Sequence, residues 1–524
     1  MPNTEPGRAH DLDAGAPDAG TLPTADVADE RDPADDVVLG ASGAPTTRAE
    51  RTVLADVVPP IALGPLDGRY RAAVAPLVDH LSEAALNRER VHVEVEWLIH
   101  LTSHHVVPGA PTLSSEEREY LRDVVRTFDA ETVAELAETE RVTVHDVKAV
   151  EYLLKSRLEA APDLLGEDTV LPRVAELVHF ACTSEDVNNL SYALMVQGAV
   201  RDVWLPAAWA LVDELAAMAH EHADVPMLAR THGQPATPTT LGKELAVLAH
   251  RLRRQLRRIG SAEYLGKING ATGTYGAHLA AVPGADWVTV SRTFVEHLGL
   301  TWNPLTTQIE SHDWQAELYA DVARFNRVLH NLATDVWTYI SLGYFAQVRG
   351  QGTVGSSTMP HKVNPIRFEN AEANLEVSCA LLDTLASTLV TSRLQRDLTD
   401  STTQRNIGPA FGHSLLAIDN VRRGLAGLDA DPAAMARDLD ANWEVLGEAV
   451  QSAMRAAGIA GVAGMEQPYE RLKELTRGRR ITGEDLRTFV EGLGLPDDVA
   501  ARLAAMTPAT YTGAAADLVR RYLD

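Results

Sequence analysis

Leucine recurs at helical spacing in the middle of the chain, and this periodicity limits the possible folds more than any other feature. The clearest stripe consists of Leu241, Leu245, Leu248, Leu252 and Leu256. It ends near Gly260, which we expect to be the helix C-cap. Similar stripes cover residues 211–219, 328–339 and 375–389, and none of them contains a proline. Segments of this kind are typical of the helices of a bundle.

The composition also favours helices. Hydrophobic residues make up 45% of the 524 residues, whereas aromatic residues make up only 5%. Alanine and leucine are abundant, which favours helical packing over a sheet sandwich. No long stretch alternates between apolar and polar residues, so we expect only short hairpins, notably around 270–276. The predicted fold class is all-α, with about three helical domains and a long central helix bundle.

The texture of the sequence divides the chain into four parts. Residues 1–55 are acidic and nearly free of large apolar side chains, so we expect a disordered extension there. We expect an N-terminal helical domain at 56–172, the central bundle at 173–425 and a C-terminal helical domain at 426–524. The apolar and alanine-rich faces of the predicted bundle helices are wider than the core of a single bundle requires. They should contact other subunits, although an oversized internal core is the alternative.

Smaller signals place individual helices. Apolar residues three and four apart predict helices over 81–101, 116–138 and 141–158. Thr482 and Asp485 have the spacing of a capping box before another helix.

Charge and cysteine content exclude several classes of protein. The net charge of −26 argues against a nucleic-acid partner, so any bound phosphate must be held by a local basic cluster. Cys182 and Cys379 are too few for a disulfide framework or a metal site, which favours a cytoplasmic location. We find no stretch typical of a membrane span or a signal peptide. No phosphate-loop, dinucleotide or zinc motif is present, and we expect no cofactor and no metal.

The segment Gly355–Pro365 carries the strongest chemical signal, and it reads GSSTMPHKVNP. Its glycine and prolines exclude a regular helix or strand, so we expect a loop. The hydroxyls of Ser356 and Ser357 lie close in sequence to the Lys362 cation and the Asn364 amide, which suits an anionic substrate. The alternative is ordinary turn chemistry, since any loop contains such residues.

This segment resembles the signature loop of the fumarase/aspartase superfamily. THGQPATP at 231–238 and TSEDVNN at 183–189 narrow the resemblance to the branch that cleaves adenylosuccinate. The resemblance implies a lyase that releases fumarate from adenylosuccinate, giving AMP, and from the succinylated imidazole-carboxamide ribotide SAICAR, giving AICAR. It also implies a homotetramer whose active sites are shared between subunits.

The resemblance implies Ser356 as the general base, because the residues alone leave Ser356 and Ser357 equally plausible. A serine can act as a base only if its alkoxide is strongly stabilised. His232 is implied as the general acid that protonates the leaving amine. An ordinary imidazole already titrates near neutrality, although a lone histidine is more often structural.

Several further residues are implied to bind the substrate. His145 and Asp146 begin a predicted helix, and Thr183 and Ser184 begin another, where free N–H groups favour carboxylates. The alternative for both pairs is simple capping, with Asp186 as the box partner of Thr183. Val144 departs from the family, which has a polar residue before this histidine, so a side-chain contact from that position is in doubt.

The resemblance also implies that the nucleotide is bound by Arg69, Tyr70, Gln308, Arg396, Ser401 and Arg405. The spacing of Arg396, Ser401 and Arg405 predicts that they lie near one helical face, for which the alternative is an ion-paired surface. Lys267 and Asn269, in a glycine-flanked loop, are candidates for lining the site.

Two other functions remain open from the sequence. One is a sister enzyme such as argininosuccinate lyase, fumarase or aspartase, which the Arg396, Ser401 and Arg405 constellation disfavours. The other is a helical scaffold without activity, which Ser356, His232 and Lys362 argue against.

Overall fold

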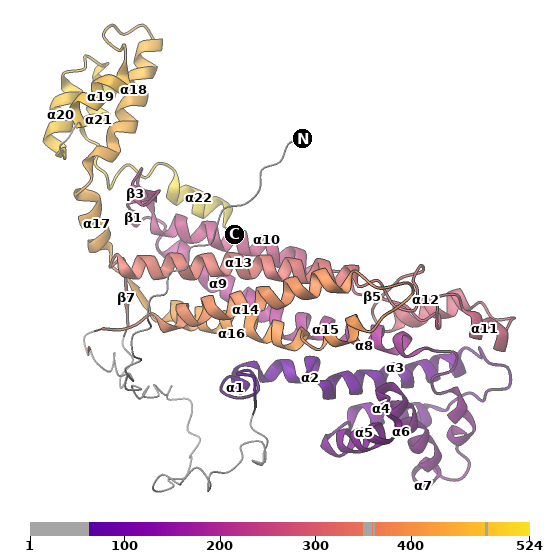
Figure 1. The fold of residues 1–524 in the computed structure, drawn as a ribbon. Helices are drawn as coiled ribbons and strands as arrows, with labels where there is room; N and C mark the ends of the chain where they lie inside the picture. The colour runs from indigo at the N-terminus through magenta and orange to yellow at the C-terminus, as the bar shows by residue number, and fades with distance from the viewer. Residues whose placement is uncertain (1–61, 349–358, 360–361, 477–479, 524) are drawn as a thin grey trace, which may run out of the picture. The chain divides into compact units, whose positions relative to one another are not determined.

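The computed structural model describes residues 62–348, 359, 362–476 and 480–523 (Figure 1). The expected acidic extension at 1–55 lies outside the described residues. Two short helices, α1 (Arg71–Val74) and α2 (Val78–Leu81), come first, with a 3-10 turn at Ala75–Leu77 between them. They lead into α3 (Glu83–Ser103), whose N-cap is Ser82.

A layer of helices packs against α3. It consists of α4 (Ser115–Arg126), α5 (Ala130–Thr143), α6 (Asp146–Ala160), α7 (Pro162–Leu165) and a 3-10 segment at Leu171–Leu177. The single helix expected over 116–138 is wrong, because Asp129 leaves helical geometry and caps α5 through the Thr132 N–H. The helix expected over 141–158 is α6, which begins at Asp146, whereas residues 141–143 belong to α5. These helices share one hydrophobic cluster that includes Val91, Leu121 and Leu154.

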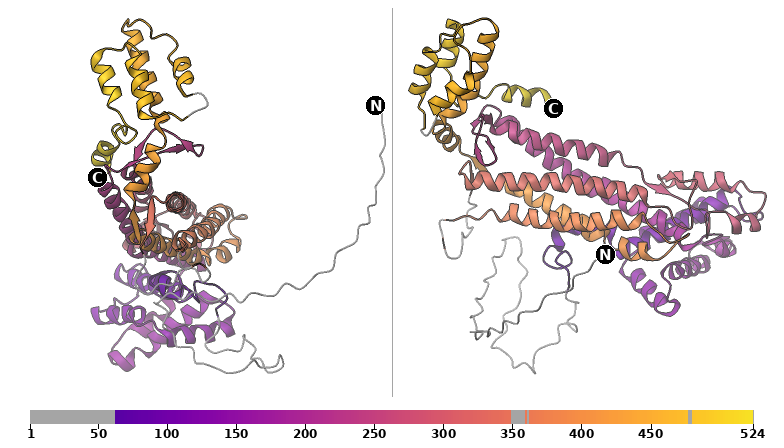
Figure 2. Two further views of the ribbon diagram at one scale, coloured as in Figure 1. Left: turned by 90° about the vertical axis from the view of Figure 1, so that its left-hand side faces the viewer. Right: turned by 45° about the horizontal axis from the view of Figure 1, so that its top comes forward.

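Long helices form the central bundle, and the views agree that they lie side by side (Figures 1 and 2). They are α8 (Ser184–Gly198), α9 (Leu205–Glu221), α10 (Leu241–Gly260), α13 (Asp313–Ser341), α14 (Ile366–Leu389) and α16 (Ile407–Ala426), with a π-helical segment at Ala199–Trp204 between α8 and α9. The predicted stripes fall on α9, α10, α13 and α14, and their leucines are buried in one cluster, apart from the partly buried Leu381. Gly260 is the last residue of α10 rather than its cap, which is Ser261.

Shorter elements connect the bundle helices. They are α11 (Gly276–Ala281), α12 (Trp287–His297) and α15 (Thr399–Gln404), with β1 (Pro226–Met227), β2 (Arg230–Thr231), β3 (Gln234–Pro235), β4 (Thr239–Thr240), β5 (Leu265–Gly266), β6 (Thr301–Trp302), β7 (Phe345–Gln347) and β8 (Leu428–Ala430). Among the described residues the strands pair two by two, and β5–β6 is the one parallel pair there. The hairpin expected around 270–276 is wrong, because this segment forms turns. A tight hairpin lies instead at 230–235.

The last part of the chain forms its own hydrophobic cluster, which includes Leu446, Met454 and Val490. Its elements are α17 (Pro432–Asp440), a 3-10 turn at Trp443–Leu446, α18 (Gly447–Ile459), α19 (Pro468–Thr476), α20 (Gly483–Glu491) and α21 (Asp497–Ala504). The last helix, α22 (Ala515–Tyr522), belongs instead to the central cluster through Val519. The predicted capping box of Thr482 and Asp485 at α20 is confirmed. In the described part of the chain, no helix combines the length and apolarity needed to span a membrane. The division into domains stays a prediction.

Gly242 allows α9 and α10 to pack closely, and this contact generates a testable prediction. A Cβ at Gly242 would lie 2.2 Å from the Ala219 carbonyl oxygen. Gly242→Ala should therefore lower the free energy of unfolding by about 1–3 kcal/mol, because backbone must move to relieve the overlap. Gly260→Ala on the same helix is the matched control, since its Cβ would meet only Leu205 Cδ2 at 3.7 Å. Denaturant titration measures both, and equal stability of the two variants would contradict this packing.

Candidate active site

The N-terminus of α8 is built around a fully buried ion pair. Lys267 Nζ lies 2.8 Å from Asp186 Oδ1, and neither side chain is exposed. Asp186 also accepts hydrogen bonds from the backbone N–H groups of Thr183, at 2.8 Å, and Asn269, at 3.0 Å. Thr183 is the N-cap of α8, so the capping prediction is confirmed, and Ser184 is the first helical residue.

Lys267 and Asn269 do not line an open site, which contradicts the prediction for both. Asn269 is 1% exposed and donates from Nδ2 to Thr306 Oγ1 at 2.7 Å. Lys267 is drawn inward because a buried carboxylate such as that of Asp186 needs a cation. The two residues therefore stabilise the α8 N-terminus from the protein interior.

The loop that leads into α8 is held in an unusual backbone conformation. His179 and Ala181 have left-handed φ angles of 58° and 59°. Glu94, which is buried on α3, accepts from the His179 backbone N–H at 2.9 Å and contacts His179 Nδ1 at 2.5 Å. Burial lowers the pKa of His179, but these interactions with Glu94 raise it above its ordinary value overall. Glu94 thereby fixes the half-buried pair Thr183 and Ser184.

Cys182, in the same loop, packs among its neighbours with its thiol hydrogen-bonded to the Phe180 carbonyl at 3.5 Å. Burial raises the pKa of its thiol well above the usual range, so the thiolate is disfavoured.

Arg396 and Gln308 meet beside the same helix. Arg396 Nη2 lies 2.8 Å from the buried carboxylate of Glu185, and its Nη1 donates to Gln308 Oε1 at 3.4 Å. Gln308 Nε2 donates to the Ala271 carbonyl at 3.0 Å. The Arg396 guanidinium is thus held in place by α8 before any ligand binds.

A polar network continues from Glu185 to the start of α6. Asn188 donates to Glu185 at 2.9 Å and accepts from Arg90 Nε at 2.9 Å. Arg90, a buried residue of α3, also donates to Asp146 Oδ2 at 2.7 Å. Burial raises the pKa of Asp146, but the charge of Arg90 and the hydrogen bonds that Asp146 accepts lower it overall, so this carboxylate is ionised at neutral pH.

Arg405 joins the network from the other side. Its Nη2 lies 3.8 Å from Asp146 Oδ2 and 3.6 Å from Glu83 Oε1, while its Nη1 donates to Ser401 Oγ at 2.9 Å. The prediction of one helical face for Arg396, Ser401 and Arg405 is wrong. Only Ser401 lies within α15; Arg396 precedes it in a loop, and Arg405 is its C-cap.

His145 is the N-cap of α6, and its Nδ1 accepts from the Lys148 N–H at 3.2 Å. The capping alternative is therefore confirmed for His145. The ring is also 52% exposed and lies beside Asp146, so capping leaves its second nitrogen available. Val144 has a left-handed φ of 52° and an exposed side chain, and it ends α5 directly before His145.

His232 lies far from this network. It occupies the tip of the hairpin formed by β2 and β3 and is exposed. The hairpin is bonded to Tyr344, just past the end of α13, by Arg230. Gln404, next to Arg405, is bonded to Gln315 at the start of α13.

The length of α13 therefore separates these two groups within one chain. From Gln315 to Ser341 the helix rises by about 40 Å, at about 1.5 Å per residue. Figure 1 shows β3 and α15 toward opposite ends of the bundle. One chain alone does not bring His232 to Arg396, Ser401 and Arg405.

Of the signature loop Gly355–Pro365, the structure describes Met359 and residues 362–365. Ser356 and Ser357 lie outside the described residues. Lys362 is exposed and Asn364 half-buried, just before α14. Arg69 lies over the ring of Tyr70 at 6.0 Å, and the Tyr70 hydroxyl accepts from Asn370 of α14 at 3.2 Å.

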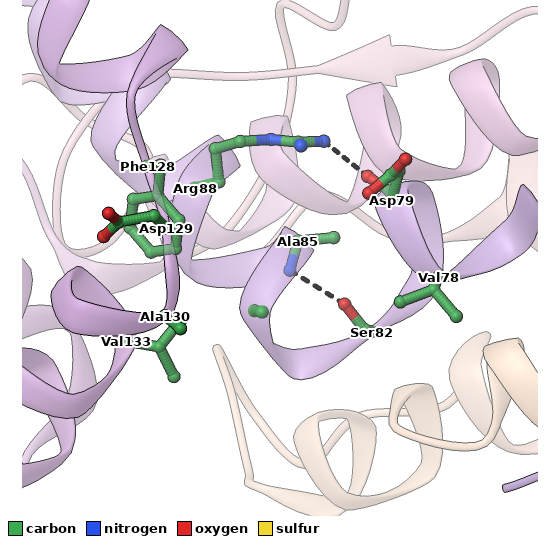
Figure 3. A pocket seen from close by; sticks show the side chains of 10 residues that line it. Val78, Asp79, Ser82, Ala85, Arg88, Phe128, Asp129, Ala130 and Val133 are labelled. Atoms are coloured by element: carbon green, nitrogen blue, oxygen red, sulfur yellow. Dashed lines mark hydrogen bonds between the residues drawn. The ribbon is translucent and has the colours of Figure 1, made fainter. Parts of the chain in front are cut away.

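A cavity of about 340 Å³ lies between α2, α3 and the start of α5, and Figure 3 shows Arg88 and Phe128 on its walls. None of the predicted site residues lines it. A smaller cavity of about 50 Å³ is lined by Glu83, Tyr192, Gln404 and Arg405. Among the described residues, no group of His, Cys, Asp and Glu side chains is arranged to hold a metal ion.

Sequence reasoning missed Arg90, Glu94 and Glu185. Arg90 comes directly before the valine-rich run Val91–Val95, and Glu94 lies within it, in a largely buried part of α3. Charged residues within such a run are a signal for buried polar networks, because a buried charge requires a partner. Glu185 lies within the TSEDVNN segment. Its partner Arg396 is 211 residues away in sequence, so the pairing cannot be inferred from the sequence.

Solved structures share this fold. A fumarate lyase from Mesorhizobium sp. BNC1 superposes with a TM-score of 0.68 at 20% identity, over 86% of this chain and 97% of that chain. The 3-carboxy-cis,cis-muconate lactonizing enzyme of Pseudomonas putida superposes with a TM-score of 0.65 at 21% identity, over 86% of this chain and 96% of that chain. Residues 68–378 match the family model described as Lyase. The predicted all-α, fumarase/aspartase-like fold is confirmed, and the protein is a lyase by class.

Sequence relatives give the family within this class. Residues 392–512 match the family model described as Adenylosuccinate lyase C-terminal. Adenylosuccinate lyase from Escherichia coli K12 is 49% identical over 87% of this chain and 98% of its own length. The Haemophilus influenzae Rd enzyme of the same name is 47% identical over 88% of this chain and 98% of its own length. The chain belongs to the adenylosuccinate lyase family and is a carbon–nitrogen lyase.

The buried pair of Lys267 and Asp186 yields a stability prediction. Lys267→Met should lower the free energy of unfolding by about 3–5 kcal/mol, because it leaves the Asp186 charge buried without a cation. Lys155→Met is the control, since Lys155 pairs with Glu151 and Glu176 nearer the surface and should cost at most about 1 kcal/mol. Chemical denaturation compares them. A cost for Lys267→Met no larger than for the control would show that this pair does not hold the α8 N-terminus.

Proposed function

We propose that the chain eliminates fumarate from adenylosuccinate, giving AMP, and from SAICAR, giving AICAR, in purine nucleotide biosynthesis. The observation that carries this proposal is the network at the start of α8, which gathers Arg396, Arg405 and the Thr183–Ser184 pair beside one helix N-terminus. Such a cluster suits a substrate that carries carboxylates and a phosphate, although the chain as a whole is strongly acidic.

The succinyl carboxylates fit the α8 N-terminus. Thr183 and Ser184 offer two hydroxyls there, and the helix dipole favours negative charge. Because Glu94 and Asp186 fix the surrounding loop, these donors are preorganised for the charge that builds up during the reaction.

The phosphate fits Arg405 and Ser401. Arg405 is 42% exposed and only loosely paired with Glu83 and Asp146, so an incoming phosphate can bind it in bidentate fashion. Arg396 and Gln308 contact each other beside Glu185 at the α8 N-terminus, and we assign the nucleoside to them. His145, Asp146, Arg69 and Tyr70 complete the proposed binding surface.

The elimination itself needs one base and one acid. Ser356, as the alkoxide, removes the proton from the carbon beside a succinyl carboxylate. The electron pair left on that carbon forms the fumarate double bond while the carbon–nitrogen bond breaks. His232, as the imidazolium, gives its proton to the departing nitrogen. Lys362 and Asn364, with Ser357, supply positive charge and hydrogen bonds on the loop that carries the base.

We propose that the working protein is a homotetramer with active sites shared between subunits. The separation of His232 from Arg405 along α13 supports this, because a single chain does not bring them together. Apolar side chains are also exposed on three bundle helices: Val247 on α10, Trp337 on α13 and Val377 on α14 are each more than 40% exposed. These faces fit contacts with other subunits.

We further propose that the enzyme acts in the cytoplasm. The two cysteines, Cys182 and Cys379, are both free, as is usual in a reducing compartment. The substrates proposed here are nucleotides of central metabolism.

Exchange of subunits between inactive variants tests both the catalytic roles of Ser356 and His232 and the proposal that active sites are shared between subunits. Ser356→Ala and His232→Ala should each lower kcat on adenylosuccinate by at least about a hundredfold, because each removes one proton-transfer group. Mixing the two variants and allowing subunits to exchange should restore part of the activity, since some sites then receive both residues. Absorbance measures turnover.

Each variant mixed with itself is the control and should stay inactive. If exchange is demonstrated by mass and no activity returns, the shared site is contradicted. Turnover of argininosuccinate, malate or aspartate in place of adenylosuccinate would instead assign a sister reaction.

A further inference from the structure

The hairpin that carries His232 is too small to hold its own shape. It has only two pairs of residues, Arg230 with Pro235 and Thr231 with Gln234. Its tip residues, His232 and Gly233, both have left-handed φ angles, of 53° and 73°. This geometry fits a two-residue hairpin turn, but it is unfavourable for histidine. A two-stranded hairpin of this size is marginal in water, so its geometry must be imposed from outside.

A charged clamp at Arg230 supplies this constraint. Arg230 Nη2 lies 2.5 Å from Asp438 Oδ2, and Nη1 donates to the Tyr344 hydroxyl at 2.9 Å. The Tyr344 hydroxyl in turn donates to the same Asp438 oxygen. The three side chains close a ring of hydrogen bonds at the base of the hairpin, two residues from His232.

The clamp joins segments that are far apart in sequence. Tyr344 is buried and follows the end of α13, and Asp438 lies in the last turn of α17. Asn442 donates to the Asp438 carbonyl at 2.7 Å and fixes that turn. Two residues beyond the far strand of the hairpin, Thr237 donates to Glu448 of α18 at 2.5 Å. Residues after position 430 thus hold the hairpin at Arg230 and hold the chain just beyond it at Thr237.

The clamp persists at neutral pH. Burial and the hydrogen bond to Asp438 raise the pKa of Tyr344 to about 12, so its hydroxyl keeps its proton. Burial lowers the pKa of Arg230, but its partners Tyr344 and Asp438 raise it overall, so the guanidinium stays charged. The Tyr344 hydroxyl and the Arg230 guanidinium therefore both remain hydrogen-bond donors at neutral pH.

We infer that Asp438 is a positioning residue for His232, acting through Arg230 and Tyr344, and that the C-terminal part of the chain thereby controls the acid step. This inference rests on the proposed function of His232. An acid that protonates a departing nitrogen must be held to within fractions of an ångström, and small misplacement is costly. Asp438 itself need not touch the substrate.

The test uses the full-length protein with Asp438→Asn, which keeps the shape and removes the charge of the clamp. We expect kcat on adenylosuccinate to fall about tenfold or more, with KM changed less than about threefold, because the defect lies in proton transfer rather than binding. Asp440→Asn is the matched control, because Asp440 is an exposed carboxylate on the same helix. It should leave both constants unchanged.

A second substrate separates positioning from general damage. An adenylosuccinate analogue with an electron-withdrawing group on the purine has a less basic leaving nitrogen and depends less on the acid. Asp438→Asn should therefore lose several-fold less kcat on this analogue than on adenylosuccinate, as His232→Ala should.

Several results would overturn the inference. They are a normal kcat for Asp438→Asn, or an equal loss on both substrates. If Asp438→Asn does not fold, Tyr344→Phe carries the same expectations, since it removes one hydroxyl from the ring. No turnover by the unmodified protein would instead overturn the proposed function, and this inference with it.

Discussion

The length of α13 is the constraint on which the account depends. This helix, of 29 residues, runs from Asp313 to Ser341 and keeps its two ends about 40 Å apart. One end adjoins Gln404 and Arg405, and the other adjoins Tyr344 and the His232 hairpin. A rigid helix buried in a bundle cannot shorten this distance. The proposed acid and the proposed phosphate site can therefore meet only when more than one chain takes part.

Buried and half-buried ion pairs organise each end of the bundle. Asp186 with Lys267, and Arg90 with Asp146, fix the start of α8 and of α6, while Asp438 fixes the hairpin. Such pairs contribute little net stability, because removing two charges from water offsets their attraction. Their contribution is geometric, since each one holds a loop or helix end in a single arrangement. Thr183, His145 and His232 lie directly on those fixed ends.

Much of the fold could be predicted from the sequence, because the leucine stripes of α10, α13 and α14 are long and regular. The break at Asp129 was missed because helix-forming residues lie on both sides of it. Helical spacing misled for Arg396 and Arg405, because spacing does not reveal that a helix is only six residues long. Lys267 was assigned to the site because its glycine-flanked loop is visible in the sequence, whereas its partner Asp186 is 81 residues away. Sequence motifs identify His232 and Thr183 as candidate site residues. The distance between them within one chain follows only from the tertiary structure, so it could not be predicted.

A solved structure of the assembled protein with AMP and fumarate bound tests the central claim most directly. The account predicts that each AMP–fumarate pair lies between chains. Arg405 and Ser401 of one chain should contact the phosphate, and His232 of another chain should lie within about 3–4 Å of the purine amine. Products bound with Arg405 and His232 of the same chain would contradict the account.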